Sequence, residues 1–180
     1  MASPRNRPGV TTRSSARPTL PSLILLNRSI FIDLAQLSAG QQSLLALPDE
    51  PLADSLPLDG FRPGLLQMFS PEHQPSKEEI DDMVWLVGRE DGDRLLPRLI
   101  RYIEARRRHQ ELWTAGLTGF AGPLHALWGL LDTIAIPAMV ERLRDLRPET
   151  RVITWDDVGH WPALEVPDRV LAAVLSALAP

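Results

Sequence analysis

Two residues in the last third of the chain, Asp132 and His160, have the types and the order needed for acid–base chemistry. A histidine can accept a proton near neutral pH and return it, which is what a general base does. A carboxylate that accepts a hydrogen bond from the imidazole holds the ring in one tautomer and stabilises its charged form. We therefore predict that His160 is a general base and that Asp132 orients it, if the fold brings them together.

Each of these two residues follows an apolar run that is typical of a β-strand. The runs span residues 124–128 and 152–155, and an amphipathic, helix-like segment follows each one, over residues 138–146 and 168–178. In a parallel α/β sheet, catalytic groups gather at the carboxyl ends of the strands. Both Asp132 and His160 are expected at that edge. Considered singly, a lone Asp after a strand is usually a helix cap and a lone His in a Gly-His turn is usually structural.

The composition indicates a folded chain and excludes several classes of function. The 180 residues carry a net charge of −4, and 44% of them are hydrophobic, which is enough for a core. The acidic balance gives no reason to expect nucleic acid, and a chain without cysteine has neither disulfides nor a thiolate metal site. No apolar stretch approaches the roughly 20 residues of a membrane span. We expect a cytoplasmic protein with no membrane partner. Eighteen arginines beside one lysine suggest a bacterial-like genome composition.

Residues 1–21 differ from the rest of the chain. They are rich in Arg, Pro and Ser and contain no acid, which predicts a disordered tail. A transit peptide has a similar composition, but the segment lacks both an amphipathic period and the apolar core of a secretory signal. Order is expected to begin with the apolar run at residues 22–27, whose length suits a strand buried on both faces.

Helical patterns fill the region between the first strand and the second. Ser76 and Glu79 have the spacing of a capping box, which opens a helix that ends near Gly88. Residues 95–103 have the apolar period of a second helix, with Pro97 in its first turn. A third segment covers residues 111–117. A basic run, which we interpret as a solvated helix face, comprises Arg98, Arg101, Arg106, Arg107 and Arg108.

With this order of elements, the chain resembles the C-terminal part of an α/β-hydrolase with a helical cap. Residues 128–137 resemble the acid motif of that superfamily, and residues 159–167 resemble its histidine motif. Segments around Asn27, Asp91-Gly92 and Trp113 are similar to the mesoderm-specific-transcript-like branch, which is related to haloalkane dehalogenases and epoxide hydrolases. The chain departs from that branch at Arg28-Ser29, where two glycines are usual, and at Ile32-Asp33, where Pro-Glu is usual.

The resemblance implies an α/β fold: parallel strands with flanking helices, and an all-helical cap inserted between two of the strands. Its parts would be a first core strand with its loop (22–33), the cap (34–120) and a C-terminal core (121–180) that carries the acid and the histidine. It also implies hydrolysis of an ester, an epoxide or a carbon–halogen bond in a small-molecule substrate, through a covalent intermediate. Asp132 and His160 would hold the acid and base roles.

A substrate pocket, by the same resemblance, would lie under the cap, and we expect it to be lined by Asn27, Trp85, Trp113 and Trp161. Large aromatic side chains are core residues by default, so these positions have a structural interpretation as well. No cofactor is expected. No metal is expected either, because the remaining histidines (His73, His109 and His125) lack the spacing of a ligand set.

The nucleophile of such an enzyme is missing from the sequence. In this superfamily the chain order is nucleophile, acid, histidine, which places the nucleophile upstream of residue 22; in the dehalogenase-like branch it is usually an aspartate. Neither Gly-x-Ser-x-Gly nor Gly-x-Asp-x-Gly occurs. Gly88 and Gly92 have the right spacing but enclose Glu90 inside the helical region. Glu90 and Asp33 are the first places to look for a nucleophile within the chain.

Three interpretations stay open. The chain is part of a hydrolase whose N-terminal half is absent from this sequence, or a half-enzyme that gives Asp132, His160 and the cap to a separately encoded nucleophile half. The third interpretation is a non-catalytic remnant, used for binding or without a function. The isolated chain is expected to be inactive. Without upstream strands, the strand at residues 23–26 would have an open edge, through which we expect self-association.

Overall fold

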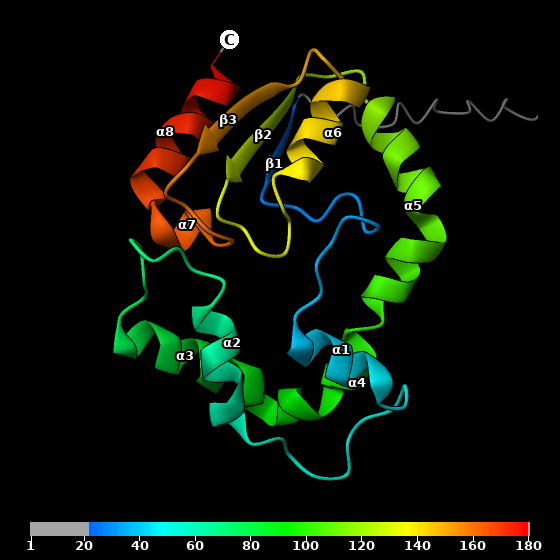
Figure 1. Cartoon of the computed structure of the whole chain (residues 1–180), viewed down its shortest axis with the longest axis vertical. Helices are drawn as coiled ribbons and strands as arrows, with labels where there is room; N and C mark the ends of the chain where they lie inside the picture. The colour runs from blue at the N-terminus through cyan, green and yellow to red at the C-terminus, as the bar shows by residue number, and fades with distance from the viewer. Residues whose placement is uncertain (1–21, 180) are drawn as a thin grey trace, which may run out of the picture.

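The structure is a computed structural model, and it describes residues 22–179. The tail expected over residues 1–21 lies outside the described residues. Two parts are visible in Figure 1: a sheet with its flanking helices, and a group of helices below it. No helix within residues 22–179 is both long enough and apolar enough to cross a membrane.

A three-stranded parallel sheet forms the first part. Its strands are β1 (Leu23–Leu26), β2 (Leu124–Gly129) and β3 (Arg151–Trp155), in the order β1-β2-β3. Leu23 lies opposite Leu124, and His125 lies opposite Arg151. Parallel neighbours require crossover connections, which are helical here. The predicted α/β class and the parallel order of the strands are confirmed.

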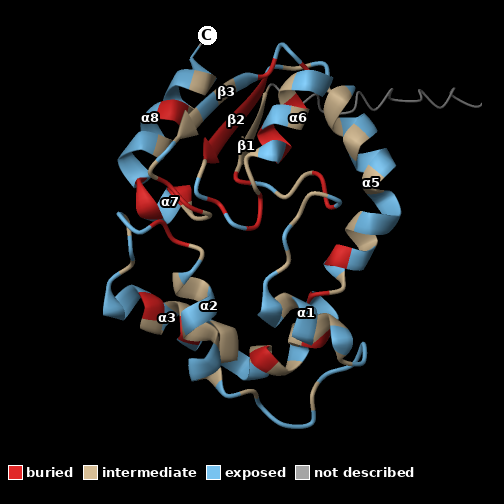
Figure 2. Ribbon diagram, viewed as in Figure 1, coloured by how far each residue is buried: buried red, intermediate tan, exposed pale blue. Residues whose placement is uncertain are grey.

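The core is centred on β2, the middle strand. All six of its residues are buried, because α6 (Ala138–Leu146) covers one face of the sheet and α8 (Pro167–Leu178) lies on the other (Figures 1 and 2). The main apolar cluster joins this strand to α6 and the first loop, and it contains Phe31, Leu124, Ala126, Trp128, Ala135, Met139, Val140 and Leu143. By contrast β1, expected to be buried on both faces, is half-buried, and among residues 22–179 it pairs only with β2.

The helices between β1 and β2 form the second part, which we call the helical insertion. They are α1 (Ala39–Ala46), α2 (Arg62–Leu66), α3 (Lys77–Gly88), α4 (Leu96–Leu99) and α5 (Tyr102–Thr118), with 3-10 turns at Leu58–Phe61 and Arg89–Leu95. Figure 2 shows fewer buried residues here than in the sheet and its loops. Helix α5 starts among the insertion helices and ends near α6 (Figure 1).

The capping box predicted at the start of α3 is present. The Ser76 hydroxyl accepts from the Glu79 amide at 3.2 Å, and the Glu79 carboxylate accepts from the Ser76 amide at 2.7 Å. Each bond satisfies an N–H group that the first helical turn leaves without a partner. The chain then turns at Glu90 and Asp91, which both take left-handed backbone angles (φ 55° and 61°).

The helix boundaries predicted after Gly92 are wrong in two respects. The helix expected over residues 95–103 is interrupted after Leu99, although Pro97 does lie in the first turn of α4. At the interruption the Arg101 guanidinium donates to the carbonyls of Leu45 and Leu47, which ties this corner to the end of α1. The separate segment expected over residues 111–117 belongs to α5, because the intervening residues are good helix formers without Gly or Pro.

Candidate active site

Asp132 lies in the loop between β2 and α6, and its carboxylate is completely buried. One oxygen, Oδ1, accepts from the amides of Ile134 and Ala135 at 2.7 and 2.8 Å. The other, Oδ2, accepts from Asn27 Nδ2 at 2.7 Å and lies 2.8 Å from His160 Nδ1. Because α6 begins only at Ala138, Asp132 is not that helix's cap. It orders its own loop and contacts the imidazole.

His160 lies in the loop after β3. The backbone amides of the residues on either side of it, Gly159 and Trp161, donate to the Glu165 carboxylate. The buried Glu165 carboxylate accepts from the amides of Ser70, Gly159 and Trp161 at 2.8–3.0 Å. The His160 amide itself donates to the Met68 carbonyl at 2.8 Å. The loop is thus fixed to the helical insertion as well as to the sheet, and this supporting role of Glu165 was not foreseen from the sequence.

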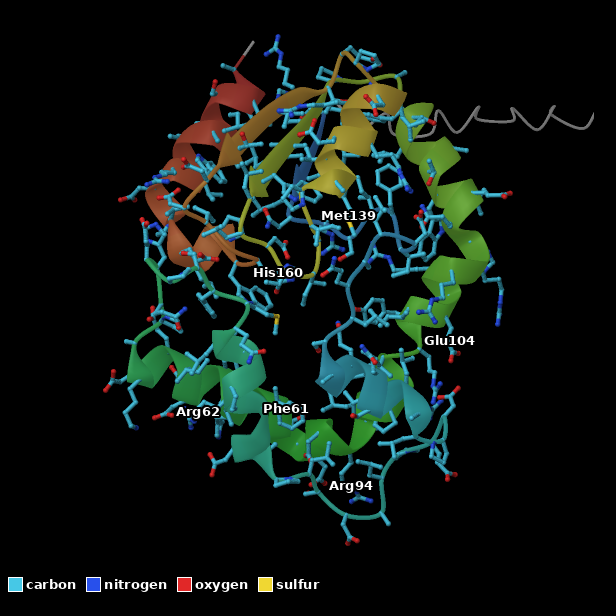
Figure 3. All side chains as sticks on the ribbon, viewed as in Figure 1. Phe61, Arg62, Arg94, Glu104, Met139 and His160 are labelled. Carbon is cyan, nitrogen blue, oxygen red and sulfur yellow. The ribbon has the colours of Figure 1, made fainter. Side chains whose placement is uncertain are left out.

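The His160 ring has one nitrogen in contact with Asp132 and the other turned away from it. With Nδ1 donating to Asp132, Nε2 is the nitrogen that carries the free lone pair. No group between residues 22 and 179 makes a hydrogen bond to Nε2, and the side chain is 18% exposed. Figure 3 shows His160 between the sheet part and the insertion helices. A small molecule placed in that space would be within reach of Nε2.

Asn27 connects both loops to the first strand. Its Nδ2 donates to Asp132 and to the Gly159 carbonyl (2.7 and 2.9 Å), and its Oδ1 accepts from the Gly129 amide at 2.8 Å. The residue is buried and has φ 41°, a left-handed conformation that Asn tolerates better than most side chains. It lines the pocket as expected, and it also braces the acid.

Glycines allow the two loops to approach each other. A Cβ at Gly129 would overlap the Gly159 carbonyl oxygen and would lie 2.5 Å from that of Val158. A Cβ at Gly159 would lie 2.6 Å from the Met68 carbonyl oxygen. The end of β2 and the histidine loop therefore pack backbone against backbone, which sets the separation of Asp132 and His160.

A pocket of about 730 Å³ opens beside His160. Three of the expected lining residues, Asn27, Trp113 and Trp161, are there; Trp85 is not, and its side chain is 60% exposed on α3, away from this pocket. Several other residues line the pocket that were not predicted to do so: Arg28, Ser29, Gln41, Leu65, Met68, Tyr102, Arg106 and Ile134.

The interpretation of the basic run as a solvated helix face is wrong for two of its five members. Arg101 donates to backbone carbonyls at the end of α1, and Arg106 is half-buried at the pocket. A run of like charges at helical spacing does not show which side chain turns inward, because that depends on the neighbouring helices. Arg98, Arg107 and Arg108 are exposed.

A second cluster of polar groups joins the histidine side of the sheet to the insertion. Glu72, His73 and Asp157 bring ligand-type atoms within 4.8 Å of one another. However, Arg169 binds Asp157 through two hydrogen bonds of 2.7 and 2.8 Å, and His73 Nε2 lies 3.1 Å from the same carboxylate. These partners, Arg169 first and His73 second, hold the pKa of Asp157 well below its usual range. Since a guanidinium already neutralises the carboxylate, we interpret the cluster as an ion-pair network.

Comparison with known proteins relates the chain to hydrolases. No family model matches it. It is 34% identical over 156 residues to the Mycobacterium tuberculosis protein LipZ, which is named as a hydrolase; the match covers 86% of this chain and 54% of LipZ. It is 30% identical over 165 residues to the mesoderm-specific transcript homolog protein of Bos taurus, covering 89% of this chain and 49% of that protein. The chain thus spans about half the length of these relatives.

Solved structures share the fold at low sequence identity. An alpha/beta hydrolase fold protein from Burkholderia ambifaria matches with a TM-score of 0.59 and 17% identity, over 87% of this chain and 56% of that one. An enol-lactonase from Burkholderia xenovorans matches with a TM-score of 0.60 and 14% identity, over 88% and 56% of the two chains. At such identities the likeness concerns the fold alone.

Proposed function

Because this chain belongs to the α/β-hydrolase fold superfamily, we propose that it provides the acid, the base and the helical cap of a hydrolase site. His160 is the general base, Asp132 orients it, and a small-molecule substrate binds in the adjoining pocket. The reaction is hydrolysis of an ester, an epoxide or a carbon–halogen bond. The observation that supports this most is the 2.8 Å contact between His160 Nδ1 and Asp132 Oδ2, with Nε2 left available.

The geometry suits the hydrolysis of a covalent ester intermediate. Nε2 takes a proton from water as the water oxygen attacks the ester carbon, and positive charge develops on the imidazole. The buried Asp132 carboxylate stabilises that charge across the Nδ1–H bond without taking the proton itself. The proton on Nε2 then passes to the departing oxygen, which returns His160 to its starting form.

The nucleophile is supplied from outside residues 22–179 in this proposal. Of the two positions considered within the sequence, Glu90 is 80% exposed in the insertion and Asp33 pairs with Arg142 at 2.7 Å, and neither lines the pocket. Ser29 does line the pocket, but its hydroxyl makes no hydrogen bond to His160 among the described contacts. The missing group could come from a longer form of this polypeptide or from a separate chain.

Two surfaces suit a contact with such a completing segment. Among residues 22–179, strand β1 is at an edge of the sheet, and no described strand pairs with its outer backbone groups. Helix α8 exposes Leu171, Leu175 and Leu178, each by more than half, along one side. We expect further strands of the fold to pair at β1. A second copy of this chain competing for the same edge would give self-association of the isolated chain.

A hydrolysis assay with 4-nitrophenyl acetate tests the proposal. We expect no turnover by the 180-residue chain alone, and turnover when it is joined to, or mixed with, the polypeptide encoded immediately upstream of Met1. His160→Ala should abolish that turnover, whereas His109→Ala, at an exposed position of α5, should leave it unchanged. A different result is turnover by the isolated chain that is lost in His160→Ala and kept in Ser29→Ala. That result would mean that residues 1–180 contain a nucleophile other than Ser29. Turnover insensitive to His160→Ala would refute the proposed role of the histidine.

A further inference from the structure

Two arginines line the pocket with no acidic partner among residues 22–179. Arg28 comes from the loop after β1, directly after Asn27, and Arg106 comes from α5. Neither makes a salt bridge or a side-chain hydrogen bond to any residue between 22 and 179, although several arginines elsewhere do. Those with carboxylate partners include Arg62, Arg101, Arg142, Arg144, Arg147 and Arg169.

The surroundings of Arg106 disfavour its charge. Burial lowers the pKa of the Arg106 guanidinium, and the nearby positive charge of Arg28 lowers it further, while Tyr102 acts weakly in the opposite direction. Arg28 is exposed and Arg106 is half-buried. A half-buried charge beside a second like charge weakens the folded state unless an anion lies beside it. A bound anion would relieve this repulsion, and no carboxylate in the described part of the chain does so.

The remaining walls of the pocket are mostly aromatic and apolar. Tyr102 and Trp113 stand on α5, Trp161 follows His160, and Leu65 and Met68 come from the other side of the insertion. At about 730 Å³ the pocket is within the size range of small-molecule sites, which typically combine apolar walls with a few polar anchors. A guanidinium fork binds a carboxylate through two parallel hydrogen bonds, so it fixes orientation as well as charge.

We propose that this pocket selects substrates that carry a carboxylate group, which Arg28 and Arg106 hold while the apolar part of the molecule lies against Trp113 and Trp161. Recognition at this end places the scissile bond toward His160. The inference rests on the proposed function for its chemistry, but the anion site itself can be tested by binding alone.

Tryptophan fluorescence measures the binding of hexanoate and of hexanamide, its neutral counterpart. The protein is the same completed form that is used in the activity assay. Hexanoate should bind about tenfold more tightly or better, as expected for charge-assisted hydrogen bonds. Arg106→Gln and Arg28→Gln should each remove most of that preference while leaving hexanamide binding unchanged. Arg107→Gln, at the exposed neighbouring position on α5, is the matched control and should have no effect.

A third probe, inorganic phosphate, separates a carboxylate-bearing substrate from a simple anion. Phosphate lacks an apolar part, so it should bind more weakly than hexanoate; equal or tighter binding would overturn the assignment to carboxylate substrates. Equal affinities for hexanoate and hexanamide, or a loss in Arg107→Gln as large as that in Arg106→Gln, would overturn the anion site altogether.

Thermal unfolding distinguishes recognition from a structural role. Arg106→Gln removes a partly buried charge that has no partner, so its melting temperature should stay the same or rise; a fall together with weaker binding of both ligands would show that Arg106 supports the fold instead. Selective hexanoate binding without any His160-dependent turnover would leave this inference standing and refute the proposed function. Turnover that depends on His160 but shows no preference for carboxylates would support the proposed function and refute this inference.

Discussion

Asn27 Nδ2 donates to the same oxygen of Asp132, Oδ2, that contacts His160 Nδ1, and the two distances are nearly equal at 2.7 and 2.8 Å. The carboxylate is therefore held between an amide that follows the first strand and an imidazole that follows the third. Because the same amide also donates to the Gly159 carbonyl, Asn27 sets the position of the acid relative to the histidine loop.

Replacing Asn27 should weaken the fold and misplace the acid. Asn27→Ala leaves the buried Gly129 amide and Gly159 carbonyl without their partner and puts Ala at φ 41°. We expect a loss of about 2–4 kcal/mol in the free energy of unfolding, measured by urea denaturation. Ser29→Ala, two residues away in the same loop, should change stability by less than about 0.5 kcal/mol. Equal stabilities of the two variants would contradict the bracing role of Asn27.

The close approach of the two loops gives a second prediction. Gly129→Ala would place a methyl group against the Val158 and Gly159 backbone, which has no room to yield, so destabilisation of about 1–3 kcal/mol or more is expected. Gly64→Ala is the matched control: nothing lies within 4 Å of its added Cβ, and it is within α2. It should stabilise by about 0.4–1 kcal/mol. Thermal unfolding that ranks the two variants in the opposite order would be incompatible with the packing described.

The Asp157 network should make stability depend on pH. Arg169 and His73 hold the folded-state pKa of Asp157 below its unfolded value. The network therefore stabilises the fold above the unfolded pKa of about 3.9. This stabilisation is lost as the pH falls toward the folded-state pKa. Asp157→Asn should lower the melting temperature at pH 7, and the difference from the parent protein should shrink between pH 4 and pH 2. A difference that is constant across this range would mean that the charge of Asp157 is not responsible.

The sequence was most informative where local chemistry dominates. The positions of the three strands and the Ser76–Glu79 capping box depend on neighbouring residues, and both features are present in the fold. It was least informative about which side chains turn inward from the insertion. Trp85 and Arg106 were interpreted by residue type alone; the packing of α3 and α5 exposes the first and brings the second to the pocket.

Long-range polar contacts were also beyond the reach of the sequence. Asn27 and Asp132 are 105 positions apart, and Ser70 and Glu165 are 95 apart. Nothing in the local pattern around either residue of such a pair specifies its partner. The resemblance to known hydrolase motifs drew attention to the segments that contain these residues, but the bonds that they make follow from the folded geometry.

The proposed function requires Asp132 and His160 to act as one unit, which a double-mutant comparison of kcat/KM in the completed protein measures. Asp132→Asn and His160→Ala should each lower kcat/KM by about 10³-fold or more, and the double variant should be no worse than His160→Ala alone, because residues that act together show non-additive losses. The effects would multiply if the two residues contributed independently. Fully multiplicative losses, or full activity in either single variant, would contradict the proposed pair.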